Sequence, residues 1–337
     1  MPKFKHLARS LPMAALLLFA GHTQAHQVVT TLKPLQLIAS AVMDGVAEPV
    51  QLLPDNASPH SFSMRPSDMQ IITDADVIFW VGPDMEQFLV RPLQRTDAKI
   101  VQLYKDDDDH EHDHAKEHRH DQGHNHDHSE EHKHDHGHEN KHDHGHKHDH
   151  DKHDHSSHGH DDHHDHDHDA HIWLDPKNAA EIAVRMTAAL TRLMPEHEPQ
   201  LMQNLVTFKE RLEELDLSIK AQLEPVQEKG FFVFHDAYGH FVDHYALNQL
   251  GYFTVDPARQ PGARHLAQIR QQLDAGNAVC VFSEPQFTSA VVETITRGTG
   301  VGHGVLDPLA RDFTPSATAY LEYLQQLADA FSGCLEG

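Results

Sequence analysis

A stretch of 64 residues without a large apolar side chain interrupts this chain and decides which parts of it can fold. From Asp106 to Asp169 the residues are almost all His, Asp, Glu, Lys, Gly and Ser, and the largest apolar side chain is Ala115. Such a stretch buries too little apolar surface to offset the entropy that ordering it would cost. We therefore expect a disordered insertion at 106–169, with folded structure before and after it.

The same insertion contains 25 of the 36 histidines, many of them alternating with aspartate. Neutral imidazole is a suitable ligand for zinc, copper and nickel, and carboxylates can complete the coordination shell. A solvated run of charge does not require so many histidines, so the composition favours metal binding. Because a flexible segment has no single geometry, we expect several weaker sites, as in an antenna or a buffer.

The first 25 residues have the pattern of a secretory signal peptide. Basic residues precede a short apolar run from Leu11 to Ala20, and Thr23 and Ala25 are small residues at the two positions that signal peptidase reads. The apolar run is too short to span a bilayer. We expect cleavage after Ala25 and a soluble mature protein in the periplasm; an N-terminal anchor helix is the alternative.

The formal charge of −25 is unevenly distributed. The insertion accounts for −16 and the signal peptide for +3, which leaves −12 for the folding remainder. No basic stripe is available to neutralise phosphates, so a nucleic-acid partner is not expected. The remainder has about 250 residues, enough for two lobes of ordinary size.

Short apolar strands alternate with helices outside the insertion, a pattern typical of parallel sheets covered on both faces. Before the insertion we expect strands at 27–32, 49–53, 77–81 and 100–104, and helices at 34–43, 67–75 and 85–93. Ser67 is the expected N-cap of the second helix. After position 225 we expect strands at 231–234, 252–255, 278–282 and 305–306, and helices at 239–247, 265–275, 289–297 and 316–331.

Two helices lie between these halves, the first at 176–194 with Asp175 as its N-cap and the second at 197–223. The second has apolar residues every three or four positions and would be about 40 Å long. The expected fold class is α/β, with two β/α lobes joined by one long helix. The expected boundaries are 26–195 for the N-terminal lobe, 196–224 for the linking helix and 225–337 for the C-terminal lobe.

Cys280 and Cys334 are the only cysteines. In an exported protein an isolated pair most simply forms one disulfide. The alternative is a thiolate metal site, which needs more ligands close by than the surrounding residues provide.

Three histidines outside the insertion lie at or near junctions between a strand and a helix: His60, His171 and His235. In parallel sheets, ligands bind outside the carboxyl ends of the strands. Three such loops could therefore bring their imidazoles to one Zn²⁺. Position alone does not distinguish this arrangement from three loop histidines that are hydrogen-bonded to the backbone.

Other polar residues have weaker patterns. His240 and His244 are one helical turn apart and could form a two-ligand face, although a place on the surface of the second lobe is favoured. His265 and His303 have no partner pattern and are expected to be structural. Glu284 either orients a ligand imidazole or is an ordinary loop carboxylate.

Four stretches resemble the metal-binding solute-receptor family of ABC transporters, and most closely its periplasmic zinc receptors of high-affinity uptake. They are PHSF through RPSD at 59–68 with WVGP at 80–83, HIWLDP at 171–176, FHDAYG at 234–239, and FSEPQF at 282–287. The resemblance covers essentially the whole mature chain except the insertion.

The resemblance implies that His60, His171 and His235 are zinc ligands in a cleft between two lobes. It also implies a Cys280–Cys334 bridge and suggests Asp307 as a tentative fourth ligand, with water as the alternative. A histidine in the third position favours zinc, because manganese-binding relatives are expected to use more carboxylate there.

The expected function is that of a monomeric receptor that captures Zn²⁺ and delivers it to the membrane permease of an ABC transporter. We do not expect an enzyme. Two alternatives stay open: a periplasmic zinc buffer that works mainly through the insertion, and a zinc hydrolase with three histidines and an open water position. The sequence has no H-E-x-x-H motif to support the hydrolase.

Overall fold

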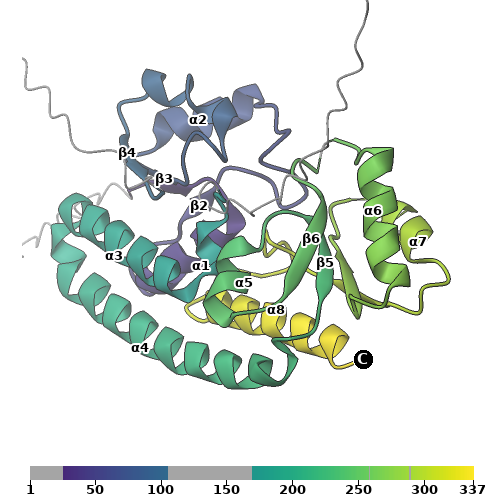
Figure 1. The fold of residues 1–337 in the computed structure, drawn as a ribbon. Helices are drawn as coiled ribbons and strands as arrows, with labels where there is room; N and C mark the ends of the chain where they lie inside the picture. Colours follow the sequence, from purple (N-terminus) through teal and green to yellow (C-terminus); the bar gives the residue numbers. More distant parts are fainter. Residues whose placement is uncertain (1–25, 105–168, 258, 288–289) are drawn as a thin grey trace, which may run out of the picture. The chain divides into compact units, whose positions relative to one another are not determined.

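The computed structural model describes residues 26–104, 169–257, 259–287 and 290–337, which belong to one compact unit of the chain (Figure 1). The expected signal peptide and nearly all of the expected insertion lie outside these residues. Within the described ranges, no helix combines the length and the apolar character needed to cross a membrane.

The first lobe is built on a four-stranded parallel sheet of order β2-β1-β3-β4. Its strands are β1 (Val28–Thr30), β2 (Val50–Gln51), β3 (Val77–Trp80) and β4 (Lys99–Gln102), and its helices are α1 (Lys33–Val42) and α2 (Pro66–Asp74). All four residues of β3 are buried, as expected for a central strand with both faces covered.

The second lobe repeats this arrangement with a parallel sheet of order β6-β5-β7-β8. Its strands are β5 (Phe231–His235), β6 (Gln249–Thr254), β7 (Cys280–Ser283) and β8 (Gly302–Val305). Its helices are α5 (Gly239–Tyr245), α6 (Ala263–Asp274), α7 (Ala290–Thr296) and α8 (Ala319–Leu335). The α/β class with two parallel-sheet lobes is therefore confirmed.

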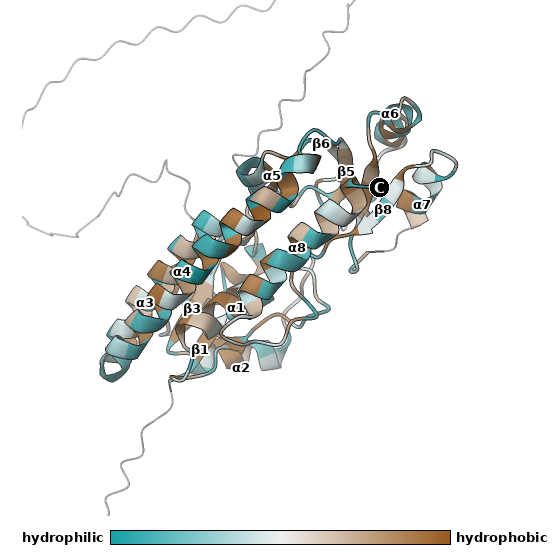
Figure 2. Cartoon of the chain, turned by 90° about the horizontal axis from the view of Figure 1, so that it is seen from below, coloured by the Kyte–Doolittle hydropathy of each residue, from teal (hydrophilic) through white to brown (hydrophobic). Residues whose placement is uncertain are grey.

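Two antiparallel helices lie between the sheets in the sequence, α3 (Pro176–Leu193) and α4 (Glu198–Leu223). Asp175 caps α3 as predicted, because its carboxylate accepts the Lys177 N–H at 2.7 Å. The 26 residues of α4 pack against α3 and α1 and also against α8 of the second lobe (Figure 1). Hydrophilic and hydrophobic residues alternate along α4 and α8 (Figure 2), which allows each helix to bury one face and expose the other.

Specific side chains attach α4 to helices from both lobes. The buried Asn204 amide donates to the Val42 and Asp44 carbonyls at the end of α1. Near the other end of α4, the Gln222 amide donates to Asp329 and Ser332 on α8. The long helix is thus fixed at both ends.

Two local predictions in the first lobe are wrong. Helix α2 begins at Pro66, so its N-cap is Arg65 and not Ser67; proline suits the first helical position, and the Asp68 carboxylate accepts the Arg65 N–H at 2.7 Å. The helix expected at 85–93 is instead two 3₁₀ turns, Gln87–Leu89 and Leu93–Arg95. Pro92 lies between them and has no N–H to continue a helical ladder.

A disulfide joins Cys280 on β7 to Cys334 on α8, with Cα atoms 5.9 Å apart. It attaches the last helix to the middle of the second sheet. Neither thiol is free, so the alternative of a thiolate metal site does not hold.

Candidate metal centre

Three histidines from separate parts of the sequence meet at one place. His60 lies in the loop before α2, His171 lies just before the short turn Ile172–Leu174, and His235 is the last residue of β5. Each offers a ring nitrogen, and these three atoms all lie within 4.8 Å of one another. In the described parts of the chain, this is the only group of three or more His, Cys, Asp or Glu side chains that meets this condition.

The imidazole rings are arranged around a common point. The ring centroids of His60 and His171 are 5.9 Å apart, and the His235 centroid lies 5.1 Å from each of the other two. A tetrahedral zinc ion with Zn–N distances of about 2.0–2.1 Å holds its nitrogens roughly 3.4 Å apart. Small side-chain rotations are therefore enough to bring the three nitrogens onto one ion.

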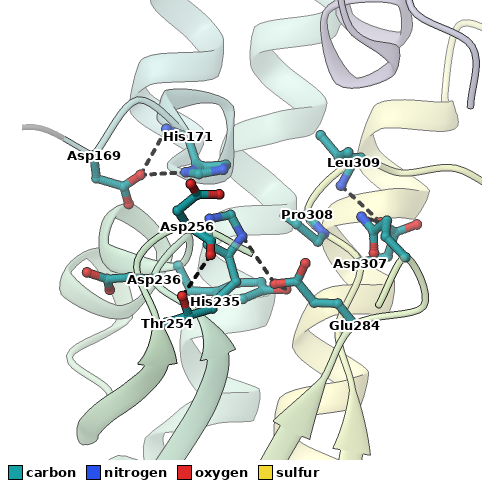
Figure 3. A network of polar contacts seen from close by, with 12 residues as sticks. Asp169, His171, His235, Asp236, Thr254, Asp256, Glu284, Asp307, Pro308 and Leu309 are labelled. Carbon is teal, nitrogen blue, oxygen red and sulfur yellow. Dashed lines mark hydrogen bonds and ion pairs between the residues drawn. The ribbon is translucent and has the colours of Figure 1, made fainter. Parts of the chain in front are cut away.

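His171 is oriented by Asp169. The Asp169 carboxylate accepts the His171 N–H at 3.0 Å and faces the ring Nδ1 at 2.7 Å (Figure 3). Because the carboxylate only accepts, Nδ1 carries the proton and Nε2 keeps its lone pair for a metal. Burial alone would raise the pKa of Asp169, but the adjacent His171 ring overcomes this and holds that pKa below its ordinary value.

His235 is buried with both ring nitrogens unsatisfied. Its side chain is only 3% exposed, and neither nitrogen has a hydrogen-bond partner among the described residues. Oε1 of the buried Glu284 lies 3.5 Å from Nδ1 (Figure 3). The same oxygen accepts the Tyr238 hydroxyl at 3.2 Å. An unpaired buried imidazole is costly, and a metal ion on Nε2 would satisfy it.

The position of Glu284 favours one of the two roles considered for it. Its side chain is 2% exposed and its Oε1 faces Nδ1 of His235, whereas an ordinary loop carboxylate would face solvent. A ligating histidine usually directs its second nitrogen to a carboxylate or carbonyl. Glu284 is placed to orient His235.

His60 differs from the other two because it is exposed. Among the described residues no carboxylate or carbonyl hydrogen-bonds its ring. Desolvation of the ring, followed by the repulsion of the neighbouring His171 and His235, lowers the pKa of His60 to about 3, although part of the residue remains open to solvent. The ring is therefore neutral near pH 7, as a metal ligand must be.

Asp307 is not brought into this group. Its carboxylate accepts the Leu309 and Arg311 N–H groups at 3.1 and 2.9 Å, and the Gln286 amide donates to it at 3.1 Å. Figure 3 shows Asp307 on the far side of Glu284 from His235. These donors organise the loop before α8.

The expectation that His240 and His244 lie on the surface is wrong for His244, and the two do not form a two-ligand face. The His244 side chain is 7% exposed and lies between Asp175 and Asp216, while His240 Nε2 lies 2.6 Å from the Asp169 carbonyl. Helix α5 is covered here by other elements, which an i, i+4 spacing cannot reveal.

The structural role predicted for His265 agrees with the 2.7 Å distance between its Nε2 and the Tyr252 carbonyl. His303 is an exposed residue of β8, a position that does not test the structural role predicted for it.

Sequence reasoning missed Asp169 by assigning it to the insertion. The structure describes it as a half-buried residue whose side chain is 8% exposed and holds His171. Asp169 is the last of many acidic residues in this stretch, so composition alone does not distinguish it from the others. The usable signal was its place two residues before a candidate ligand.

Comparison with known proteins shows the family to which the chain belongs. Residues 28–334 match the family described as zinc-uptake complex component A, periplasmic. The high-affinity zinc uptake system protein ZnuA of Haemophilus influenzae is 44% identical to the chain and covers 98% of it, with 99% of that relative covered. The chain belongs to this family.

A second member of the zinc-uptake component A family, the ZnuA protein of Yersinia pestis, is 39% identical with 99% of both chains covered. A crystal structure of ZnuA superposes with a TM-score of 0.67 at 21% identity and covers 92% of this chain and 99% of its own. At that identity the superposition shows the shared fold. The matches extend over both lobes.

Proposed function

We propose that this chain captures Zn²⁺ with His60, His171 and His235 and delivers it to the membrane permease of an ABC transporter. The observation that carries the proposal is the meeting of three imidazole nitrogens within 4.8 Å, together with a buried His235 whose ring nitrogens have no hydrogen-bond partner among the described residues. The relatives named as high-affinity zinc uptake proteins support the same cargo and the same periplasmic location.

The donor set supports zinc over manganese. Three neutral nitrogens suit a borderline ion such as Zn²⁺, whereas Mn²⁺ prefers carboxylate and water oxygens. Asp307, the tentative fourth ligand, accepts from backbone N–H groups and from Gln286. We therefore favour water over Asp307 in the fourth position.

We propose the lobe boundaries inferred from the sequence, 26–195 and 225–337 with the linking helix at 196–224. We further propose that the mature chain begins after Ala25 and acts as a monomer without a nucleic-acid partner. The family to which the chain belongs takes up zinc and is not a family of enzymes, so the chain is a receptor and not a hydrolase.

Deleting the insertion distinguishes a receptor with a folded zinc site from a buffer that binds zinc mainly through the insertion. Replacing 106–168 with a short glycine-serine linker while keeping Asp169 should leave the cluster intact, because Asp169 holds His171. Calorimetric titration of this variant should still show one tight zinc site, with manganese a weak competitor. Full-length protein should show additional, weaker zinc binding.

Alanine variants of the three histidines then test the cluster itself. In the deletion background, His60→Ala, His171→Ala and His235→Ala should each abolish the tight site, while the control His303→Ala, on exposed β8, should not. Loss of tight binding on deletion alone would overturn the folded site in favour of the buffer. Zinc-loaded protein should also stimulate ATP hydrolysis by the reconstituted cognate transporter, and His60→Ala should not.

A further inference from the structure

The segment 169–175, which carries His171, is held at both ends by helix α5. His240 and His244 lie one turn apart on α5. His240 Nε2 lies 2.6 Å from the Asp169 carbonyl, and because a carbonyl only accepts, the imidazole donates this hydrogen bond. At the other end, His244 Nδ1 lies 3.1 Å from Oδ1 of Asp175.

The second nitrogen of His244 reaches a third element. Its Nε2 lies 2.7 Å from Oδ1 of Asp216 on α4, and the His244 side chain is only 7% exposed. Both partners are carboxylates, and a neutral imidazole has a single N–H to donate. Two simultaneous hydrogen bonds require the imidazolium, whose charge strengthens both of them. His244 therefore joins α5 to the N-cap of α3 and to the C-terminal half of α4.

The middle of the segment is attached to the second lobe as well. The indole of Trp173 is fully buried and donates to the Pro308 carbonyl at 2.8 Å, and the Tyr320 hydroxyl on α8 donates to the Trp173 carbonyl at 2.7 Å. Segment 169–175 thus has three anchors on the second lobe, although it precedes that lobe in the sequence.

Helix α5 also follows His235 closely in the chain. Only residues 236–238 separate the end of β5 from the start of α5. Helix α5, which holds segment 169–175, is therefore connected through only these three residues to His235, the other buried histidine of the cluster.

We propose that His240 and His244 are positioning residues for zinc, which clamp the two ends of segment 169–175 to α5 and so fix His171 opposite His235. His171, although it lies within the N-terminal boundaries 26–195, then forms one pre-oriented pair with His235 against the second lobe, and His60 in the loop before α2 completes the site. This inference rests on the proposed zinc site and adds to it the elements that set its geometry.

The test measures zinc affinity by competition with a chelating dye, using the full chain lacking only 106–168. His240→Ala and His244→Ala should each weaken zinc binding by about 10- to 100-fold, the usual effect of losing a group that orients a metal ligand. His240→Gln should restore affinity to within about threefold, because its amide N–H can donate to the same carbonyl.

A matched control is available in the same lobe. His265 on α6 also directs Nε2 to a carbonyl, that of Tyr252 at 2.7 Å, but its partner is outside segment 169–175. His265→Ala should keep wild-type zinc affinity. Visible spectra of the Co²⁺-loaded proteins give a readout beyond stability: the d–d bands should shift in His240→Ala and return in His240→Gln.

The possible outcomes distinguish an error in the proposed clamp from an error in the proposed zinc site. Wild-type affinity and wild-type Co²⁺ spectra in folded His240→Ala, alongside weakened binding in His171→Ala, would overturn the clamp and leave the site standing. Equal weakening in His265→Ala would also overturn it, because the effect would then be general to the lobe. Wild-type affinity in His171→Ala itself would overturn the proposed site and the clamp with it.

Discussion

The Nδ1 atom of His171 lies 2.7 Å from Oδ1 of Asp169, two residues earlier in the chain. This contact sets the tautomer of the ring and directs Nε2 toward the other two histidines. Since both side chains are almost fully buried, water cannot easily replace the carboxylate.

Asp169→Asn should weaken zinc binding by about 10- to 100-fold, because an amide oxygen accepts less strongly than a carboxylate and does not fix the tautomer. Zinc affinity in the variant lacking 106–168 is the measurement. Asp274→Asn, which changes an exposed carboxylate paired with Arg270, is the control and should have no effect. Unchanged affinity in Asp169→Asn would show that the ring keeps its orientation without this contact.

Glu284→Gln tests the orientation of His235 in the same way. The neutral side chain keeps the volume and an acceptor for Tyr238, yet it weakens the attraction to Nδ1 of His235 at 3.5 Å. We expect a loss of zinc affinity of about tenfold. Tyr238→Phe separates the two contacts of Glu284: if it matches Glu284→Gln, the hydroxyl and not the carboxylate charge orients the site.

The strands of both lobes could be predicted because their chemistry is local. Val77–Trp80 and Cys280–Ser283 are continuous buried runs, and such runs identify central parallel strands without knowledge of their neighbours. The Asp175 cap was predictable for the same reason, since a side chain and an N–H two residues later decide it.

The supporting residues of the site could not be predicted in this way. His244 lies between Asp175 and Asp216, and these partners are 69 and 28 residues away in the sequence. Only the tertiary structure brings His244 to the start of α3 and to α4, and the local spacing of residues does not predict these contacts. The three histidines became candidates because each lies at or near a junction between a strand and a helix. Position alone did not identify them as ligands; that prediction came from the resemblance to the receptor family.

Removal of the disulfide should lower the free energy of unfolding. Cys280 and Cys334 are 54 residues apart, and closing such a loop is worth about 4 kcal/mol in the chain-entropy model. Denaturant titration of the double variant Cys280→Ala, Cys334→Ala should show this loss. A reductant should destabilise the wild type to a similar extent and leave the double variant unchanged; equal stability of the two proteins without reductant would contradict the prediction.

Glu86 should make the wild type less stable as the pH rises. This fully buried carboxyl accepts from Thr31 and from the Val81 and Gly82 N–H groups, yet burial outweighs these donors and raises the pKa of Glu86 to about 7. The folded state therefore holds the proton more tightly than the unfolded state, and stability falls between about pH 4.5 and 7. The full cost of ionisation is about 3 kcal/mol.

Glu86→Gln removes this titration while its amide oxygen can still accept from the Val81 and Gly82 N–H groups, and its amide N–H can donate to the Thr31 hydroxyl oxygen. Relative to wild type it should gain stability between pH 5 and pH 8, by up to about 3 kcal/mol. Urea titrations at the two pH values measure the change. A difference between the two proteins that does not vary with pH would show that Glu86 ionises in the fold as it does in water.

His244 should give the opposite pH dependence. The hydrogen bond to Asp175 raises the pKa of His244 above 6.5, and a second bond to Asp216 raises it further. Burial of the ring acts in the opposite direction but is outweighed. Its contribution to stability is then complete below the unfolded pKa and is lost as the pH rises through the folded pKa.

His244→Gln keeps one donor and cannot become charged, so it should be less stable than wild type at pH 5.5, and this difference in stability should narrow at pH 9. Thermal unfolding without zinc at both pH values measures the gap. A gap for His244→Gln that widens at pH 9 would mean that the neutral ring, and not the imidazolium, joins Asp175 and Asp216.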